Sequence, residues 1–404
     1  MISVLVINCG SSSLKFQVFD MTGVTVKAKG IVERIGDSSK LRMTVKGQQQ
    51  EINDRPVRTH EEAVEMILDV LTGGEEPVIK SAREINAVGH RVVHGGTVFS
   101  GPALVDKAVK KAIKRLEVLA PLHNPPALKG IIACEKNIPN VPQVAVFDTA
   151  FHHTLPKKAY LYSIPYEFYE KYGVRKYGFH GTSHKFVARR TADILKRPLE
   201  ELKIITCHLG SGASITAIQN GKSVDTSMGF TPLEGLTMGT RCGDIDPSIV
   251  TFIMEKEGMS ADEVREFLNR KCGVLGISGI SSDFRDLEKA ALKGNVRAIT
   301  ALKVFIYDVK RYICSYIGIL NGLDALVFTA GLGENSPFIR QQICRNMSFL
   351  GLEVDASKNE SACGKQSFIS KDTSRPILVV PTNEELMIAV DTADMISEPS
   401  RSFA

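Results

Sequence analysis

The chain has 404 residues, of which 43% are apolar and 24% are charged, and its formal net charge is +5. This length exceeds what one hydrophobic core usually supports, so we expect two domains of ordinary size. Because no basic tract stands out and no segment reaches the roughly 20 continuous apolar residues of a membrane span, the sequence argues against a nucleic-acid-binding or membrane protein.

The eight cysteines show no paired short spacing, and several lie in apolar segments. This distribution is typical of reduced, buried thiols and predicts neither a zinc site nor a disulfide framework. The amino-terminal residues run directly into a strand and lack the basic region and cleavage site of a secretory leader. We therefore expect a cytoplasmic protein.

The apolar pattern predicts strands and helices in alternation. The first strands are expected at 4–7, 14–19, 24–35 and 41–45, followed by a helix over 63–71 that Thr59 caps. Further strands are expected at 85–93, 144–147, 204–207, 325–328 and 377–380. Further helices are expected at 108–119, 261–269, 285–292 and 295–320, after Pro337, and at the end of the chain through Met395. Such alternation predicts α/β layers.

One pattern occurs twice: an apolar strand, a turn rich in glycine and serine, and a second strand. Residues 4–19 and 204–218 both follow it, so that Asn8 corresponds to His208 and Gly10 to Gly210. Glycine lets the backbone turn with φ > 0, so that successive N–H groups face one anion. An ordinary turn is the alternative for one such segment alone. The pair predicts a duplicated architecture whose halves hold a polyphosphate from both sides.

Six residues lie at or just beyond the ends of apolar strands: Asn8, Arg91, Asp148, His208, Gly331 and Glu384. Ligands of open α/β sheets bind outside the carboxyl ends of the strands. We therefore expect these six strands to bring their polar groups to one cleft.

Together these segments resemble the acetate kinase family, over nearly the whole chain. The shared segments are residues 8–15, 89–96, 121–126, 146–152, 177–184, 225–229, 238–241, 331–335 and 381–385. The family belongs to the superfamily of acetate and sugar kinases, heat-shock chaperones and actin. The resemblance implies an α/β fold of two duplicated actin-like, ribonuclease H-like domains with a cleft between them. Residues 1–150 plus 385–404 would form domain I, and residues 151–384 a nucleotide-binding domain II.

The activity implied by the resemblance is the reversible, in-line transfer of the ATP γ-phosphoryl group to acetate, giving acetyl phosphate and ADP. Mg²⁺ is the implied cofactor, with Mn²⁺ as an alternative, and a homodimer is the implied assembly. A kinase of propionate or another short-chain acid is the nearest alternative. A nucleotide-driven chaperone or filament subunit is a second, but no segment of the chain is left over for a peptide-binding module.

Four residues are implied to be catalytic: Arg91, Asp148, His180 and Arg241. Arg91 would hold the carboxylate, and Arg241 and His180 would stabilise the transferring group, with His123 and His208 as further candidates. A solvated surface cation is the alternative for a lone arginine, and a packed core residue for a lone histidine. His60 and His152 are interpreted as structural.

The family gives Asp148 an acid/base role. A carboxylate substrate with a pKa of roughly 4 to 5 is already ionised at neutral pH and needs no base. We therefore expect Asp148 to order a magnesium-bound water or the attacking carboxylate. Asn8 and Glu384 resemble the magnesium site of the family, and oxygen ligands of this kind suit Mg²⁺. An acid favoured by the helix dipole is the alternative for Glu384.

The nucleotide site implied by the resemblance draws on three loops and Lys15. Its residues are Lys15, His208, Leu209, Gly210, Ser211, Gly212, Asp283, Phe284, Arg285, Gly331, Leu332, Gly333, Glu334 and Asn335. The implied pocket for the substrate methyl group consists of Val93, Leu122, Phe179 and Pro232. One departure concerns Ser211, where the family usually has asparagine. Serine keeps a hydroxyl but loses the amide, which changes the nucleotide contact.

Overall fold

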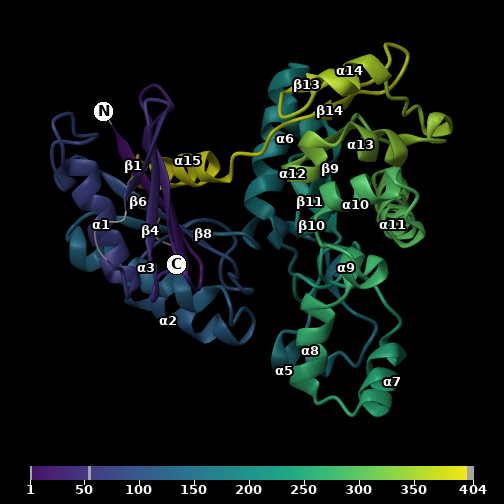
Figure 1. The fold of residues 1–404 in the computed structure, drawn as a ribbon, viewed down its shortest axis with the longest axis horizontal. Coiled ribbons are helices and arrows are strands. Elements are labelled where there is room, and N and C mark those ends of the chain that lie inside the picture. Colours follow the sequence, from purple (N-terminus) through teal and green to yellow (C-terminus); the bar gives the residue numbers. More distant parts are fainter. Residues whose placement is uncertain (1, 53–55, 398–404) are drawn as a thin grey trace. The chain divides into compact units, whose positions relative to one another are not determined.

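The computed structural model describes residues 2–52 and 56–397. Its chain divides into two compact units (Figure 1), which we call unit 1 and unit 2. Unit 1 consists of Met1–His153 with Asn383–Ala404, and unit 2 of Thr154–Thr382. The domain boundaries inferred from the sequence, 150/151 and 384/385, stay a prediction.

Unit 1 is built on an eight-stranded mixed sheet. Its strands are β1 (Ser3–Cys9), β2 (Ser13–Asp20), β3 (Thr25–Glu33), β4 (Lys40–Val45), β5 (Gln48–Ile52), β6 (Ala87–Val92), β7 (Ala103–Leu104) and β8 (Gln143–Phe147). They lie in the order β5-β4-β3-β2-β1-β6-β8-β7. β1, β6 and β8 run parallel, while β2 to β5 form an antiparallel meander beside β1.

Helices cover both faces of this sheet. Successive side chains of β1 point to opposite faces, so each face presents apolar side chains that a helix can cover. The helices are α1 (His60–Thr72), α2 (Lys107–Arg115), α3 (Asn124–Asn137) and α15 (Glu384–Ser397). Leu5 and Ile7 join the buried cluster that contains α1 and α3 side chains, whereas Val4 and Val6 pack with Ile388 of α15. The carboxyl-terminal helix therefore completes the core of unit 1.

Unit 2 repeats the same sheet. Its strands are β9 (Lys203–Leu209), β10 (Ala213–Gln219), β11 (Lys222–Thr226), β12 (Ala325–Thr329), β13 (Ser367–Phe368) and β14 (Ile377–Val379), in the order β11-β10-β9-β12-β14-β13. The central run β11-β10-β9-β12-β14 matches β3-β2-β1-β6-β8 in order and in strand direction. The predicted α/β fold with two duplicated domains is confirmed.

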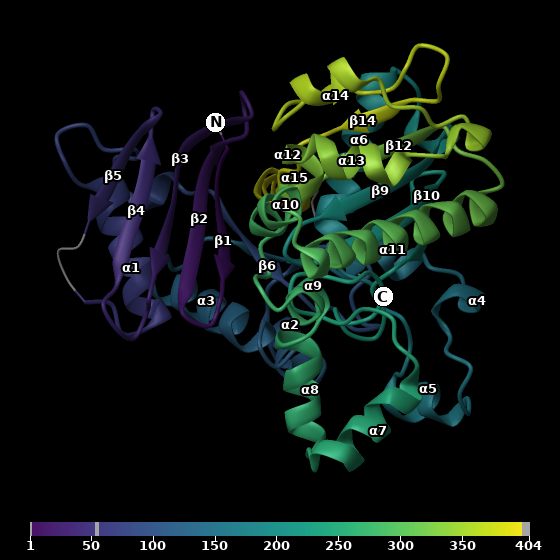
Figure 2. The ribbon, with the colours of Figure 1, turned by 45° about the vertical axis from the view of Figure 1, so that its right-hand side comes forward.

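The helices of unit 2 are α4 (Lys157–Tyr160), α5 (Glu167–Tyr172), α6 (Gly181–Leu195), α7 (Pro247–Glu257), α8 (Ala261–Arg270), α9 (Gly273–Ser278), α10 (Phe284–Leu292), α11 (Val296–Leu320), α12 (Ala330–Asn335), α13 (Pro337–Cys344) and α14 (Ala356–Ser361). α6 packs on β9 and β12, and the long α11 packs on β9 and β10 (Figure 2). Short 3₁₀ turns lie at Ala82–Glu84, Leu116–Val118, Ala150–Thr154, Leu199–Glu201 and Ser348–Leu350.

The strands predicted from the sequence are all found. The helices predicted over 63–71, 261–269, 285–292 and 295–320 are found as α1, α8, α10 and α11. The helix expected over 108–119 ends at Arg115 and continues as a 3₁₀ turn. All eight cysteines are free thiols, and four of them are buried. None of the helices in the described ranges is long and apolar enough to cross a membrane.

Candidate active site

The two glycine-serine turns close corresponding hairpins. In β1–β2 the last pair is Cys9 opposite Leu14, and in β9–β10 it is Leu209 opposite Ala213, so the second turn is tighter. Gly10 N–H donates to Ser13 O over 2.8 Å, and Gly210 N–H donates to Gly212 O over 3.1 Å. A Cβ on Gly10 would lie 2.9 Å from Ser13 Oγ, which explains the glycine.

The sequence predicts a structural role for His60, and its contact agrees with this prediction. The contact also shows that His60 supports the first turn. Its Nε2 lies 2.8 Å from the Gly10 carbonyl oxygen. The ring is buried at the start of α1 and therefore braces the first turn. The two residues are far apart in the sequence, so local pattern could not reveal the contact.

Arg91, Asp148 and Glu384 form one charged cluster in unit 1. Arg91 lies on β6, Asp148 directly follows the neighbouring strand β8, and Glu384 begins α15. Arg91 Nη2 donates to Asp148 Oδ2 over 2.7 Å, Nε donates to the same carboxylate over 3.1 Å, and Nε lies 3.8 Å from Glu384 Oε2. Burial lowers the pKa of Arg91, but Asp148 and Glu384 outweigh it, so the pKa is raised. The guanidinium group of Arg91 is thus held in a fixed orientation.

Negative charge is only partly compensated in this cluster. Burial is the largest cause that raises the pKa of Glu384, Arg91 and Lys15 oppose it, Asp148 and Glu385 add to it, and the pKa is about 7 as a result. Ile7 of β1 lies opposite His90 of β6, so the following residue, Asn8, lies beside Arg91 in the sheet. Asn8 and Glu384 thus offer oxygen ligands at one sheet edge, which suits a divalent cation that keeps several waters. Across the described ranges, no group of three or more His, Cys, Asp and Glu side chains is arranged to hold a metal.

His180 of unit 2 is held in a strained backbone conformation. It precedes α6 with φ 55°, in the left-handed region that residues other than glycine rarely adopt. Its Nδ1 lies 2.9 Å from Ser214 Oγ, and its ring stacks on His208 with centroids 4.1 Å apart. Strain of this kind concentrates where a side chain must be aimed. Here it aims an imidazole at the second turn.

Arg241 reaches the same turn. A Cβ added to Gly212 would lie 3.3 Å from Arg241 Nη1 and 3.4 Å from His180 Nε2. Arg241 Nη1 donates to the Pro232 carbonyl over 3.2 Å, and burial lowers the pKa of the guanidinium. Both side chains thus lie close beside the backbone at Gly212, where a Cβ would make tight contacts with them. The turn, Arg241 and His180 therefore form one cationic and hydrogen-bonding surface in unit 2.

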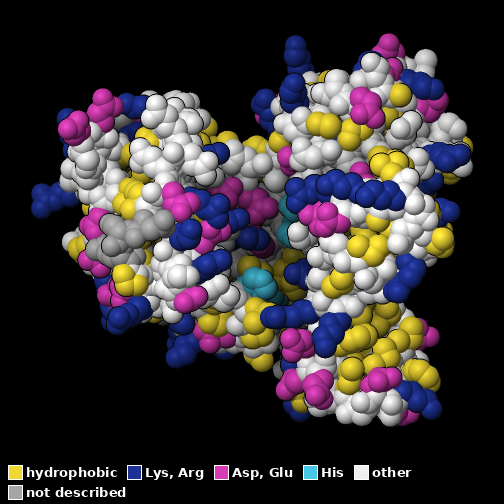
Figure 3. All heavy atoms as spheres, viewed as in Figure 1, with side chains coloured by type: hydrophobic (Ala, Val, Ile, Leu, Met, Phe, Trp, Pro, Cys, Tyr) yellow, Lys and Arg dark blue, Asp and Glu magenta, His cyan; other side chains and the backbone are white. Residues whose placement is uncertain are grey.

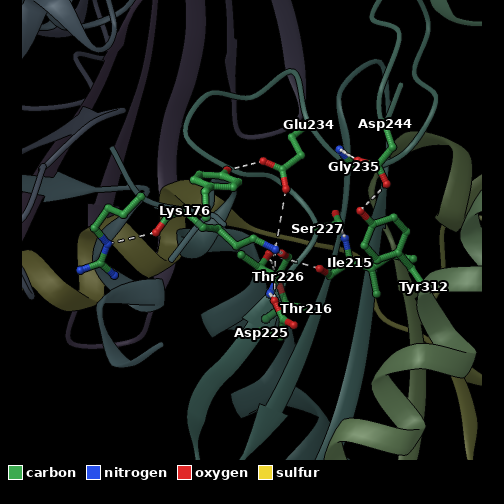
Figure 4. A network of polar contacts seen from close by, with 12 residues as sticks. Lys176, Ile215, Thr216, Asp225, Thr226, Ser227, Glu234, Gly235, Asp244 and Tyr312 are labelled. Atoms are coloured by element: carbon green, nitrogen blue, oxygen red, sulfur yellow. Dashed lines mark hydrogen bonds and ion pairs between the residues drawn. The ribbon is translucent and has the colours of Figure 1, made fainter. Parts of the chain in front are cut away.

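The loop that carries Pro232 and Arg241 is anchored by a buried polar network (Figure 4). Lys176 Nζ donates to Asp225 Oδ1 over 3.3 Å and to the Thr226 carbonyl over 2.9 Å, and it lies 3.9 Å from Glu234. Tyr162 donates its hydroxyl hydrogen to Glu234. Burial raises the pKa of Glu234, while Tyr162 and Lys176 oppose this. Sequence reasoning missed this network.

A second set of bonds anchors the same loop farther along. Gly235 N–H donates to Asp244 Oδ1 over 2.9 Å, and Tyr312 of α11 donates to Asp244 Oδ2 over 2.8 Å. The loop is therefore tied to the long helix as well as to β11. Its rigidity fixes the position of Arg241.

The predicted nucleotide loops are well ordered by their own side chains. Glu334 accepts hydrogen bonds from Ala330 N–H over 2.7 Å and from Thr382 N–H over 3.1 Å, so it closes the start of α12. Asp283 caps α10 and pairs with Arg285 Nη2 over 2.5 Å, and this pairing lowers its pKa to about 2. Ser211 is exposed at the tip of the second turn.

The other predicted side chains fall into both units. In unit 1, Lys15 is exposed on β2, Val93 is half-buried, Leu122 is exposed, and His123 is exposed at the start of α3. In unit 2, Phe179 is buried and Pro232 half-buried. Unit 1 therefore brings together Arg91, Asp148 and Glu384, and unit 2 brings together His180, His208 and Arg241.

Comparison with known proteins identifies relatives over the whole chain. A model of the acetokinase family matches residues 3–390. The acetate kinase of Natranaerobius thermophilus is 57% identical over 98% of this chain and 100% of its own length, and that of Thermotoga maritima is 56% identical over 98% and 100%. The crystal structure of the Porphyromonas gingivalis acetate kinase is similar with a TM-score of 0.94 and 47% identity, covering 98% of this chain and 100% of that one.

A propionate kinase is also similar. The crystal structure of the Francisella tularensis propionate kinase matches with a TM-score of 0.91 and 42% identity, over 98% of this chain and 100% of that one.

Proposed function

The chain belongs to the acetokinase family, and we propose that it is an acetate kinase, a phosphotransferase with a carboxyl group as acceptor. It transfers the ATP γ-phosphoryl group to acetate and forms acetyl phosphate and ADP, reversibly. The observation that carries the proposal is the surface at Gly212, where Arg241 Nη1 and His180 Nε2 converge on an anion-binding turn. Donors placed in this way stabilise charge on a transferring phosphoryl group.

Unit 1 supplies the acceptor end of the reaction. The Arg91 guanidinium binds the carboxylate and cancels part of its repulsion against the phosphate. Asp148 holds Arg91 through two hydrogen bonds and so fixes the attacking oxygen, rather than removing a proton that acetate has already lost. Val93, Leu122, Phe179 and Pro232 are the proposed contacts to the methyl group.

Unit 2 supplies the donor end. Residues 208–212 and 331–335 are the proposed contacts to the ribose and phosphates of the nucleotide, and residues 283–285 are a further proposed nucleotide contact. Lys15 adds a compact positive charge from unit 1. Arg241 and His180 compensate charge that develops during in-line transfer, with His208 beside them. We propose residues 1–150 plus 385–404 as domain I and 151–384 as the nucleotide-binding domain II.

Asn8 and Glu384 are the proposed residues for Mg²⁺, with Mn²⁺ as the alternative. The burial of Glu384 beside the carboxylates of Asp148 and Glu385, which raises the pKa of Glu384, supports this choice. When bound, the cation neutralises and orients the phosphate oxygens. Glu384 and Asn8 hold few of its ligand positions, and the remaining ones are left to water and phosphate.

A hydroxamate trap for acyl phosphate tests the proposal directly. Purified protein with ATP and Mg²⁺ is expected to form acetyl hydroxamate, with kcat/KM for acetate above that for propionate by about tenfold and above that for butyrate by more. One methylene in such a pocket changes binding by about 1 kcal/mol. A preference for propionate would favour the alternative of a propionate kinase, and no acyl phosphate with any acid would reject both.

We also propose that the protein is a homodimer. No side chain of α7 is buried, and Ile249 and Phe252 on it are exposed, as are Phe168 and Tyr172 of α5. Figure 3 shows the hydrophobic side chains gathered over this part of unit 2. An apolar surface of this kind is typical of an interface, and a second copy is its proposed occupant.

Sedimentation velocity tests the dimer. Phe252→Glu is expected to shift the protein to monomers, because it places a charge in the apolar surface. Phe349→Glu, at a phenylalanine outside α5 and α7 that is even more exposed than Phe252, serves as the control and is expected to leave the dimer intact. A monomer in the unaltered protein would contradict the proposal. The cytoplasmic location stays a prediction.

A further inference from the structure

We propose that two chains of hydrogen bonds from buried hydroxyl groups hold His180 and His208 as neutral rings with the hydrogen on Nε2. Each ring then meets the transferring phosphoryl group as a preset donor. Ser214, His184, Thr206, Ser183 and Thr382 are the positioning residues. The inference rests on the proposed function for the identity of the anion, but the tautomers can be measured without turnover.

The first chain leads to His180 from the middle of the sheet. Thr206 Oγ1 of β9 lies 2.7 Å from His184 Nδ1, and His184 Nε2 lies 2.7 Å from Ser214 Oγ of β10. Ser214 Oγ in turn lies 2.9 Å from His180 Nδ1. Thr206, His184 and Ser214 are completely buried. The order is therefore Thr206, His184, Ser214, His180, with Nε2 of the last ring facing Gly212.

Counting hydrogens couples the two rings. The Ser214 hydroxyl has one hydrogen, and it faces two imidazole nitrogens. If Ser214 donates to His180 Nδ1, His184 Nε2 must be the donor to Ser214, and Thr206 must then donate to His184 Nδ1. If the direction is reversed, His180 Nδ1 carries the hydrogen and Nε2 becomes an acceptor. In both of these states Ser214 donates to one ring and accepts from the other, so the tautomer of His180 is coupled to that of His184 and to the orientation of the Thr206 hydroxyl.

The charge at the site selects the first state. His180 and His184 lie at the amino-terminal turn of the 15-residue α6, whose dipole disfavours a positively charged imidazole. A phosphate at the Gly212 turn requires donors, and Nε2–H of neutral His180 is such a donor. Thr206 therefore donates inward, and every hydrogen of the chain points toward the anion.

The second chain repeats this arrangement behind His208. Ser183 Oγ of α6 lies 2.8 Å from His208 Nδ1, and 2.7 Å from Thr382 Oγ1. With Thr382 donating to Ser183 and Ser183 donating to Nδ1, His208 also carries its hydrogen on Nε2. The two rings stack with an interplanar angle of 18°, so their outer edges are presented together. The site thereby gains two parallel neutral donors, each oriented by a serine hydroxyl.

Loss of one hydroxyl group should allow His180 to populate both neutral tautomers while its ring stays in the protein. Ser214→Ala leaves His180 Nδ1 and His184 Nε2 without their bridge, so His180 populates both tautomers and loses its fixed donor. Thr206→Val keeps the shape of the side chain but removes the first donor, whereas Thr206→Ser keeps the hydroxyl. Thr216→Val is the matched control: Thr216 is buried two residues along β10 from Ser214, and its hydroxyl bonds Thr226 instead (Figure 4).

The experiment is a long-range ¹H–¹⁵N correlation spectrum of the full chain with ¹⁵N-labelled histidine, with His180 assigned by His180→Gln. The unaltered protein, Thr206→Ser and Thr216→Val are expected to show His180 with the hydrogen on Nε2. Ser214→Ala and Thr206→Val are expected to show mixed tautomers. In the same variants kcat should fall about tenfold to a hundredfold, with KM for acetate changed less than about twofold.

Two results would overturn the inference: a hydrogen on Nδ1 of His180 in the unaltered protein, or an unchanged tautomer in both Ser214→Ala and Thr206→Val. If Ser214→Ala fails to fold, the Thr206→Val and Thr206→Ser pair decides alone. Failure of the proposed function looks different, because the tautomers would be as expected while no acyl phosphate forms.

Discussion

At the scale of single residues, the two site arginines are buried in different surroundings. Arg91 is held by Asp148 and Glu384, which raise its pKa, whereas Arg241 contacts the Pro232 carbonyl and burial lowers its pKa. The positive charge of Arg91 is therefore partly neutralised before a ligand binds, and Asp148 and Glu384 also fix the orientation in which it meets the substrate carboxylate. Arg241 gains more from an arriving anion, because a phosphoryl oxygen replaces lost hydration.

A buried histidine next to Arg91 makes the stability of unit 1 depend on pH. His90 is 1% exposed, and burial lowers its pKa to about 4. The Gln143 amide, turned with its nitrogen toward the ring, donates to Nε2 over 2.5 Å. The unfolded chain, with a histidine pKa of about 6.5, binds more protons than the folded chain between pH 6.5 and 4. The contribution to stability is present above pH 6.5 and is lost as pH falls toward 4, by at most about 3 kcal/mol.

Urea unfolding at pH 7.5 and pH 5 measures this effect. His90→Asn is expected to lower the stability at pH 7.5 and to weaken its decrease toward pH 5. Burial also lowers the pKa of His94 to about 4. Titration of His94 should therefore keep part of the pH dependence of stability in this variant. His153→Gln, at an exposed histidine, is the control and should keep the full slope. An unchanged slope in His90→Asn would show that His90 does not titrate in this window.

The sequence identified residues whose role is local to a motif, and it missed those that act through long-range contacts. Arg91, Asp148 and His180 stand in recognisable segments. Lys176 does not, and Ser214 stands in the repeated hairpin with no sign of its role, because both residues act through partners at positions 180 and 226 that only folding brings near. Their hydroxyl and ammonium groups are ordinary in isolation, so no local pattern separates them from surface residues.

At the scale of elements, the short helix α9 acts as the support of the Arg241 loop. Cys272 N–H donates to the Thr240 carbonyl over 3.0 Å, and Val274 N–H donates to the Met238 carbonyl over 2.9 Å. The sequence pattern predicted neither α9 nor α3, which begins with prolines, because tertiary contacts hold them. Backbone hydrogen bonds therefore tie the loop to the helix.

Gly273 tests this support. It has φ +65°, and a Cβ there would lie 2.2 Å from the Met238 carbonyl oxygen and 2.8 Å from that of Arg241. Gly273→Ala should displace the Arg241 loop and lower kcat/KM by about a hundredfold, since small misplacements of catalytic groups cost that much. Gly258 at the end of α7 has the same φ with nothing within 4 Å. Gly258→Ala should therefore cost about 1 kcal/mol of stability and leave the hydroxamate assay unchanged. Equal activity in the two variants would contradict the role of α9.

At the scale of the whole molecule, one sheet topology has been used twice, and each copy carries different chemistry at the same place. The edge beside β1 holds Asn8 and the Arg91 cluster, whereas the corresponding edge beside β9 holds His208 and the turn at Gly212. The repeated hairpin made the duplication predictable from the sequence. The division of labour was not, because the two turns look alike until their neighbours are known.

The proposed reaction requires the two units to act on one transition state, and a double-variant cycle tests this. Arg91→Lys and Arg241→Lys keep the charge but lose the planar fork, so each should lower kcat/KM for acetate by about tenfold to a hundredfold. If both groups contact the same transferring phosphoryl group and its acceptor, the double variant should lose clearly less than the product of the two single losses. Arg190→Ala on the outer face of α6, combined with Arg91→Lys, gives the additive reference, because Arg190 is exposed and bonds Gln366. Strictly multiplicative losses for the arginine pair, with all variants folded by circular dichroism, would mean that the two guanidinium groups serve separate steps.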